Sequence, residues 1–299
     1  MRTAARAQPL AFPRRLALEW FGRGSLLRRV TARKVNIVAL AVVLTVIATA
    51  ILAPLIAVHD PIKTRPFEIH QGPSAKYWLG TDDIGRDTFS RLVYGARISV
   101  QVGFIAVGIA MGLGTPLGLL AGFQGGFTDE VIMRVMDGIF VLPTLILALA
   151  IAAIMGASLE SVMVAIGFTN MPRYARLMRG EVLAVREYDY VLAARGIGAP
   201  SLRIALVHIL PNSMAPIIVQ GALSVGFAIF TEATLSFLGV GIKPPTPSWG
   251  SMLQGGYRYM DINLIESFAP GMAIFLTVLA VNLLGDGLRE ALDPRLRGA

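Results

Sequence analysis

Long runs of apolar residues, separated by polar and charged segments, divide the chain into six candidate membrane spans. A helix of about 20 apolar residues crosses the hydrocarbon core of a bilayer, and the first run is long enough to do so. The pattern therefore predicts an all-α integral membrane protein with six transmembrane helices. The six runs cover residues 36–58, 98–122, 138–156, 162–171, 211–238 and 268–286.

Two of these runs carry further structural information. The second has glycines at four-residue spacings, including Gly114, Gly118 and Gly122, and small residues at that spacing let helices approach closely in lipid. The fourth run is short for a span, which leaves a re-entrant segment open. We favour a helix that leaves the membrane and continues as the polar stretch 173–186.

The distribution of charge predicts how the spans are oriented. Charged residues make up only 15% of the chain, whereas soluble domains carry about 25%, and the net charge is +8. Basic residues concentrate in segments 1–34 and 173–210, and cytoplasmic loops are enriched in Lys and Arg. We therefore expect both termini in the cytoplasm. A signal peptide at the N-terminus is a weaker interpretation, because the apolar run continues past Ala50.

The spans divide the chain into four segments. We expect a basic cytoplasmic segment over residues 1–34, then the first transmembrane helix and an external loop over 35–96. Residues 97–286 form the transmembrane core, and 287–299 form a cytoplasmic tail.

Polar residues in the external loop suggest two local features. Asp87 is placed to cap a short helix along the membrane surface, with Phe89 on its apolar face. Asp82 and Asp83 invite a cation site, but ion pairing with nearby arginines is the better interpretation.

Several chemistries are absent from the sequence. The chain has no cysteine, which excludes disulfides, thiolate metal sites and cysteine nucleophiles. It contains no Gly-Lys dipeptide and hence no Walker A phosphate loop, and no His-Glu-x-x-His or Gly-x-Ser-x-Gly motif. No cluster of catalytic polar residues lies within the spans. We therefore expect a protein that is not an enzyme and that binds no nucleic acid, its basic residues serving orientation in lipid.

The polar segment between the fourth and fifth spans carries the most informative motif, over residues 188–211. We interpret it as a helix, a glycine turn, a second helix and the proline start of a span, because glycine permits bends that side chains resist. Small residues within it let another surface approach the backbone. The members of the motif are Tyr190, Leu192, Ala193, Ala194, Arg195, Gly198, His208, Leu210 and Pro211.

This segment resembles the Glu-Ala-Ala loop of binding-protein-dependent ABC importer permeases. In that family the loop forms a coupling helix that docks into a groove of the ATPase subunit. Leu192 stands in place of the glutamate that names the loop, and His208 in place of the usual isoleucine. Both departures fit the dipeptide, oligopeptide and nickel branch. Signatures of that branch are also resembled by residues 79–91, 231–250 and 282–295, which together indicate a C-type permease subunit.

The resemblance implies a type I importer permease fold in a bacterial inner (plasma) membrane. The chain is then expected to pair with a B-type permease and form half of a translocation pathway. Two ABC ATPase subunits carry ATP and Mg, and an extracytoplasmic binding protein delivers the substrate. This chain itself is expected to bind no cofactor. The cargo stays open among dipeptide, oligopeptide, nickel chelate, glutathione and opine.

Glu232 is the one other candidate site residue, because an ionisable group in an apolar span is costly and usually functional. It either lines the pathway or its gate, or it holds a neighbouring helix. The alternative function is a secondary transporter, which needs two related halves and ionisable groups near the midplane. Glu232 is the one such candidate, and no internal repeat is evident.

Overall fold

The computed structural model describes residues 30–31 and 33–292, so the basic cluster in 1–29 and the tail 293–299 lie outside the described residues. Apart from one isolated bridge between Thr81 and Asp87, the described residues form helices and loops. The elements are α3 (Lys34–Ile56), α4 (Thr88–Gln124), α5 (Gly126–Val141), α6 (Thr144–Met155), α7 (Leu159–Val185), α8 (Asp189–Gly196), α9 (Ser201–Arg203), the π-helix η1 (Ile204–Ile209), α10 (Leu210–Phe237), α11 (Trp249–Tyr257) and α12 (Ile265–Leu292).

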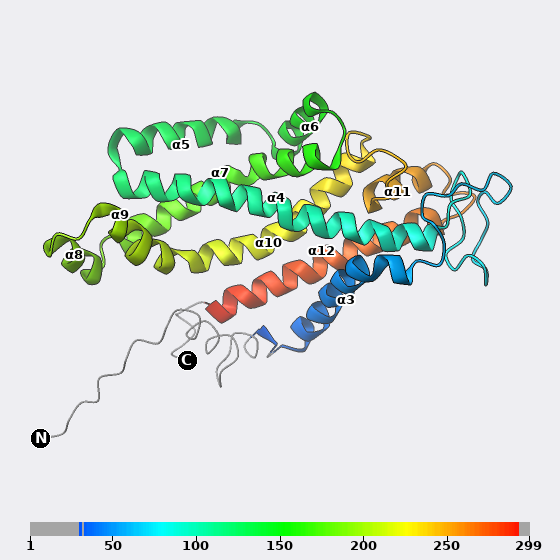
Figure 1. The fold of residues 1–299 in the computed structure, drawn as a ribbon, viewed down its shortest axis with the longest axis horizontal. Coiled ribbons are helices and arrows are strands. Elements are labelled where there is room, and N and C mark those ends of the chain that lie inside the picture. The colour runs from blue at the N-terminus through cyan, green and yellow to red at the C-terminus, as the bar shows by residue number, and fades with distance from the viewer. Residues whose placement is uncertain (1–29, 32, 293–299) are drawn as a thin grey trace, which may run out of the picture.

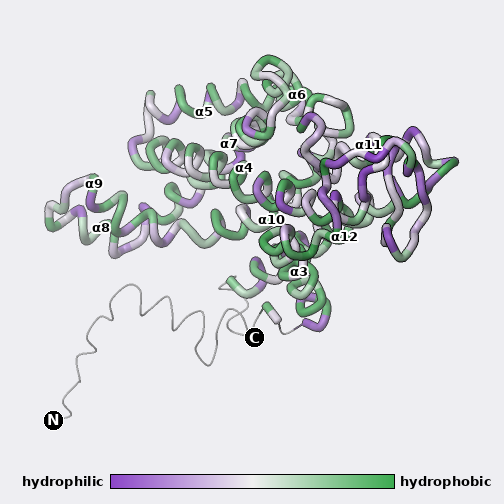
Figure 2. Tube along the Cα trace, turned by 45° about the vertical axis from the view of Figure 1, so that its right-hand side comes forward, coloured by the Kyte–Doolittle hydropathy of each residue, from purple (hydrophilic) through white to green (hydrophobic). Residues whose placement is uncertain are grey.

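The long helices α3, α4, α7, α10 and α12 run roughly along the long axis (Figure 1). Helices α4, α7 and α12 run toward the α8 end, and α3 and α10 run the opposite way. At one end lie α8 and α9, and at the other lie α11 and the loop 57–87. The start of α3 and the end of α12 both lie toward the α8 end. Figure 2 shows hydrophobic residues along the bundle and a larger share of hydrophilic residues in the loop at the α11 end.

Four helical segments are long and apolar enough to cross a membrane: Lys34–Ile56, Thr88–Gln124, Ser201–Phe237 and Ile265–Leu292. They contain the predicted second, fifth and sixth spans almost entirely, and the first to within two residues. The fourth run forms part of α7, which continues without a break through the polar stretch, as predicted. Because the second half of α7 is charged, α7 is not among the four helices that are apolar enough to cross a membrane.

The predicted third span, residues 138–156, is not a single helix. Its residues are divided between α5 and α6, which meet at a bend of 90°, and together they form a fifth candidate span only as a bent pair. The break falls at Leu142, which has extended backbone, and at Pro143, whose φ of −53° and ψ of 127° are also non-helical. Proline disfavours helical geometry in the residue before it and has no N–H to continue the ladder.

The predicted surface helix near Phe89 is also wrong as a separate element. Asp87 caps a helix as predicted, since its carboxylate accepts from the backbone N–H of Ser90 at 3.1 Å, but that helix is α4 itself. Polar residues in the first turn of α4, such as Thr88 and Ser90, are buried in the protein. Arg91 is buried and donates to the carbonyl of Pro61 at 3.1 Å.

Helices α4 and α7 pack through the glycines that the sequence singled out. A Cβ on Gly118 would lie 2.2 Å from the carbonyl oxygen of Ala175, and one on Gly114 would lie 2.4 Å from that of Met171. Neither distance is sterically possible, so these two helices touch backbone to backbone at this place. Gly112, on the same helix, faces open space.

Candidate functional site

The end of the bundle formed by α8 and the turn after it holds most of the predicted motif. One face of α8 is anchored, because Val191 is fully buried and Ala194 is 8% exposed. They belong to a core cluster that includes Tyr174 and Met178 of α7 and Ile209 of η1. The helix is therefore fixed to the bundle by its inner face and cannot swing freely.

The other face of α8 is open and largely apolar. Ala193 lies on it, so the two neighbouring alanines of the motif have different surroundings: Ala193 faces outward and Ala194 packs inward. Four large apolar side chains near Ala193 in the sequence are also exposed in the described chain. These are Tyr188 (54% exposed), Tyr190 (41%), Leu192 (46%) and Ile197 (85%).

A glycine turn ends α8, as predicted. Gly198 has φ +75°, and its N–H donates to the carbonyl of Arg195 at 3.0 Å. The N–H of Ala199 donates to the carbonyl of Ala194 at 3.1 Å. This pair of bonds is the Schellman motif, in which a left-handed residue, usually glycine, closes the helix. A Cβ at Gly198 would meet nothing within 4 Å, so backbone geometry alone favours glycine here.

The passage from this turn into the span differs from the predicted second helix. The short α9 leads into the π-helix η1, which runs directly into α10 with Pro211 in its first turn. The N–H of Leu210 donates to the carbonyl of Ala205, five residues back. Proline cannot continue the usual ladder, which accounts for a wider turn at this position. His208 is half-buried, and its carbonyl accepts from the side-chain amide of Asn212 at 2.6 Å.

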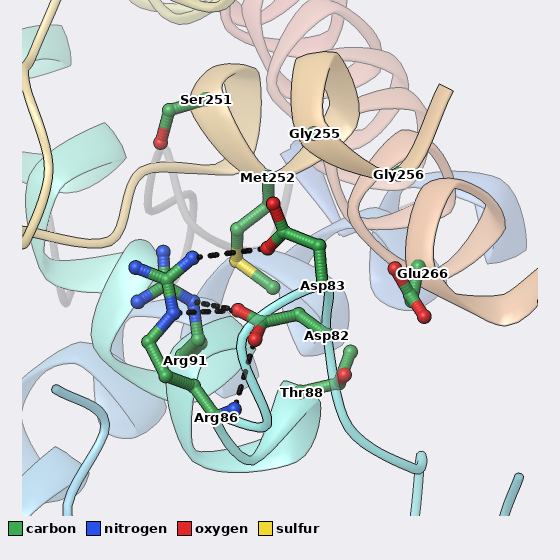
Figure 3. Close-up of a pocket in the computed structure, with 10 residues that line it drawn as sticks. All are labelled: Asp82, Asp83, Arg86, Thr88, Arg91, Ser251, Met252, Gly255, Gly256 and Glu266. Atoms are coloured by element: carbon green, nitrogen blue, oxygen red, sulfur yellow. Dashed lines mark hydrogen bonds and ion pairs between the residues drawn. The ribbon is translucent and has the colours of Figure 1, made fainter. Parts of the chain in front are cut away.

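Charged residues gather at the opposite end of the bundle (Figure 3). Asp82 accepts from Arg86 Nε at 2.7 Å and lies 3.4 Å from Arg91 Nε, while Asp83 lies 3.6 Å from Arg86. Within the described residues no group of acidic and histidine side chains could hold a metal ion. The predicted ion pairing of these acids with Arg86 and Arg91 is present.

The same loop is tied to the last span and to its neighbours. His70 Nδ1 lies 2.8 Å from Glu266 Oε1, and the side-chain amide of Asn263 donates to the carbonyl of Gln71 at 3.5 Å. His59 donates its backbone N–H to Ser90. These contacts make the loop a fixed cap on the bundle.

Glu232 is fully buried within α10. Its Oε1 accepts from the hydroxyl of Ser236 at 2.8 Å, and its Oε2 has no hydrogen-bond partner. The first turn of α11 packs on this part of α10, where a Cβ on Gly250 would lie 2.4 Å from the carbonyl of Ala233. Glu232 therefore sits beneath the helix that closes the loop end of the bundle.

Comparison with known proteins decides the family. A family profile described as "Binding-protein-dependent transport system inner membrane component" matches residues 114–298. The chain belongs to this family. It is a membrane-spanning permease subunit of an ABC importer, as the motif at α8 predicted, and no finding supports the secondary-transporter alternative.

Curated relatives agree over nearly the whole chain. The dipeptide transport permease DppC of Alkalihalophilus pseudofirmus is 45% identical over 270 residues, which cover 90% of this chain and 89% of the relative. The glutathione transport permease GsiD of Pectobacterium atrosepticum is 44% identical over 271 residues, or 90% of each chain. GsiD of Escherichia coli is 41% identical over 99% of this chain and 97% of its own. They confirm the resemblance to C-type permeases of peptide importers.

Among solved structures, the MetNI methionine ABC transporter in inward-facing form has a similar chain. The match has a TM-score of 0.55 at 17% identity and covers 68% of this chain and 96% of that one. At this identity it shows the fold alone, which is that of a type I importer permease.

Proposed function

We propose that this permease forms half of the translocation pathway of an ATP-driven peptide importer and that the exposed face of α8 docks on an ATPase subunit. The observation that supports docking on an ATPase subunit is the exposed apolar face of α8. These exposed side chains lie in a basic polar segment and not on a span. We therefore expect another protein, and not lipid, to cover them. The relatives named for dipeptide and glutathione transport support a peptide cargo.

The proposed assembly contains a B-type permease, two ATPase subunits that hold ATP and Mg, and an extracytoplasmic binding protein. ATP binding closes the ATPases, and their movement reaches the spans through α8, which α7 and η1 connect to the bundle. Anchored by Val191 and Ala194, α8 transmits displacement rather than absorbing it.

Substituting Ala193 tests the docking surface. We expect Ala193→Asp to abolish the stimulation of ATPase activity by loaded binding protein, because a larger charged side chain blocks close approach and loses its hydration. Ala193→Ser, which stays small, is the matched control and should behave as wild type. Because position 193 faces outward on α8, neither substitution should change membrane insertion. Full stimulation in Ala193→Asp would contradict docking at this face.

We further propose six membrane crossings with both termini in the cytoplasm of a bacterial inner membrane. The four apolar helices, the bent pair α5–α6 and α7 supply the crossings, and their alternating directions support the count (Figure 1). Since the chain lacks cysteine, single cysteines can be labelled selectively. A cysteine at Phe67, which is 99% exposed, should react from outside, and one at Ile197 only after permeabilisation. Reaction of position 197 in intact cells would refute this topology.

Glu232 is proposed to contribute to the outer gate of the pathway. Glu232→Gln keeps the shape of the side chain and an oxygen acceptor for Ser236 but removes its capacity for charge. We expect transport to slow severalfold while insertion stays normal. Ser236→Ala is the companion variant that removes the neighbouring hydroxyl. Unchanged uptake kinetics in Glu232→Gln would leave only a packing role.

A further inference from the structure

A cavity of about 690 Å³ opens between α7, α10 and α12 near the α8 end of the bundle. Its volume falls in the range of about 300–1,000 Å³ that is typical of small-molecule sites. Among its lining residues are Glu181 and Tyr188 on the α7 side, Asn212 and Gln220 from α10, and Arg289 from α12. The walls between them are mainly aliphatic.

Two opposite charges line this cavity, and they come from different helices. Glu181 is the one acidic residue of the lining and Arg289 the one basic residue. In the part of the chain that the structure describes, neither forms an ion pair, although other exposed arginines do, such as Arg33 with Glu290 at 2.8 Å. Glu181 is partly buried, so its charge is only partly hydrated.

The neutral polar groups of the lining suit a peptide backbone. The amide side chains of Asn212 and Gln220 can both donate and accept hydrogen bonds. Asn212 donates one N–H to the carbonyl of His208 in η1, and Gln220 donates one to the hydroxyl of Ser224 in α10. Each therefore keeps an amide oxygen for a ligand. An acid, a base and two amides around one cavity match a molecule with an ammonium group, a carboxylate and peptide bonds.

We infer that this cavity is a transit site for a short zwitterionic peptide, with its ammonium group at Glu181 and its carboxylate at Arg289. This inference rests on the proposed function and adds the residues that hold the charged ends of the peptide. Tyr188, the N-cap of α8, also lines the cavity. A bound peptide would thus touch the residue that begins the docking helix.

Protection of an introduced cysteine tests the site. Ala215→Cys places a thiol in the cavity lining of this otherwise cysteine-free chain. The assembled complex is labelled with a small maleimide, without binding protein or ATP, and labelling is read on this chain. We expect L-alanyl-L-alanine to slow the labelling. Its N-acetylated and amidated forms should need about tenfold higher concentrations, because each lacks one charged contact.

The charge variants should give a crossed pattern. In Glu181→Gln, the N-acetylated peptide should protect at the same concentration as the free peptide, while the amidated form still needs more. In Arg289→Gln, the amidated peptide should protect at the same concentration as the free peptide, while the N-acetylated form still needs more. Glu187→Gln, an exposed acid outside the lining, is the matched control and should change neither. A cysteine at Gly180, exposed on α7 outside the lining, should show no protection.

Three results would overturn the inference. They are a cysteine at 215 that does not react because another subunit covers it, an absence of protection, and protection that ignores both end groups of the peptide. Each would leave ATP-driven uptake by the wild-type complex intact, whereas failure of the proposed function would abolish that uptake itself.

Discussion

Gly118→Val is expected to prevent stable assembly of the bundle. The added side chain would begin 2.2 Å from the carbonyl oxygen of Ala175, and Met178 Cβ lies 2.8 Å from the same point. Because the obstructing atoms belong to a helix backbone, α4 and α7 must separate. We expect destabilisation of about 3 kcal/mol or more. The measurement is the yield of folded protein in detergent and its thermal unfolding temperature.

Gly112→Val is the matched control for this prediction. It makes the same change on the same helix, six residues earlier, where a Cβ meets nothing within 4 Å. It should express and unfold as wild type does. Equal behaviour of the two variants would show that close contact between α4 and α7 does not hold the bundle together.

Gly198→Val is expected to uncouple ATP hydrolysis from transport without preventing insertion. At φ +75° a β-branched residue is strained by about 1–3 kcal/mol, so the Schellman turn should open and α8 lose its fixed orientation. Transport should be lost together with the stimulation of ATPase activity by loaded binding protein. Reconstituted complexes, assayed with and without binding protein, give this result directly.

Gly196→Val separates backbone strain from bulk. Gly196 is the last residue of α8, has no positive φ, and has open space where a Cβ would stand. Its valine variant should couple normally. Wild-type stimulation in Gly198→Val would contradict the role of this turn, and loss of stimulation in both variants would assign the effect to bulk at the docking surface.

The sequence predicted most of the bundle because long apolar runs can form little else in lipid. It also predicted the Gly198 turn, since glycine is the usual residue with positive φ where a helix ends. The predicted third span is not a single helix, because the chain breaks at Pro143. The angle of that break depends on how α5 and α6 pack against α7, which the sequence does not reveal. The separate surface helix was wrong because Arg91 is buried against loop 57–87, where it contacts Pro61 and Asp82, within a helix that continues into the span.

Details of the candidate site depend on tertiary contacts and were beyond sequence reasoning. Ala193 and Ala194 look equivalent in sequence, and only the packing of α8 against η1 and the surrounding core turns one outward and the other inward. Glu181 and Arg289 lie more than a hundred residues apart and line one cavity, with no local motif to connect them. Asp129 and Arg179 are likewise far apart in the sequence, and no local motif predicts that Asp129 accepts two hydrogen bonds from Arg179.

The energy source of transport tests the central claim most directly. The complex of this chain with its partner permease, ATPase subunits and binding protein is reconstituted in liposomes, and uptake of a labelled dipeptide is measured. We predict uptake that requires ATP and loaded binding protein and that persists when proton and sodium gradients are dissipated. Uptake driven by an ion gradient in the absence of ATP would contradict the account.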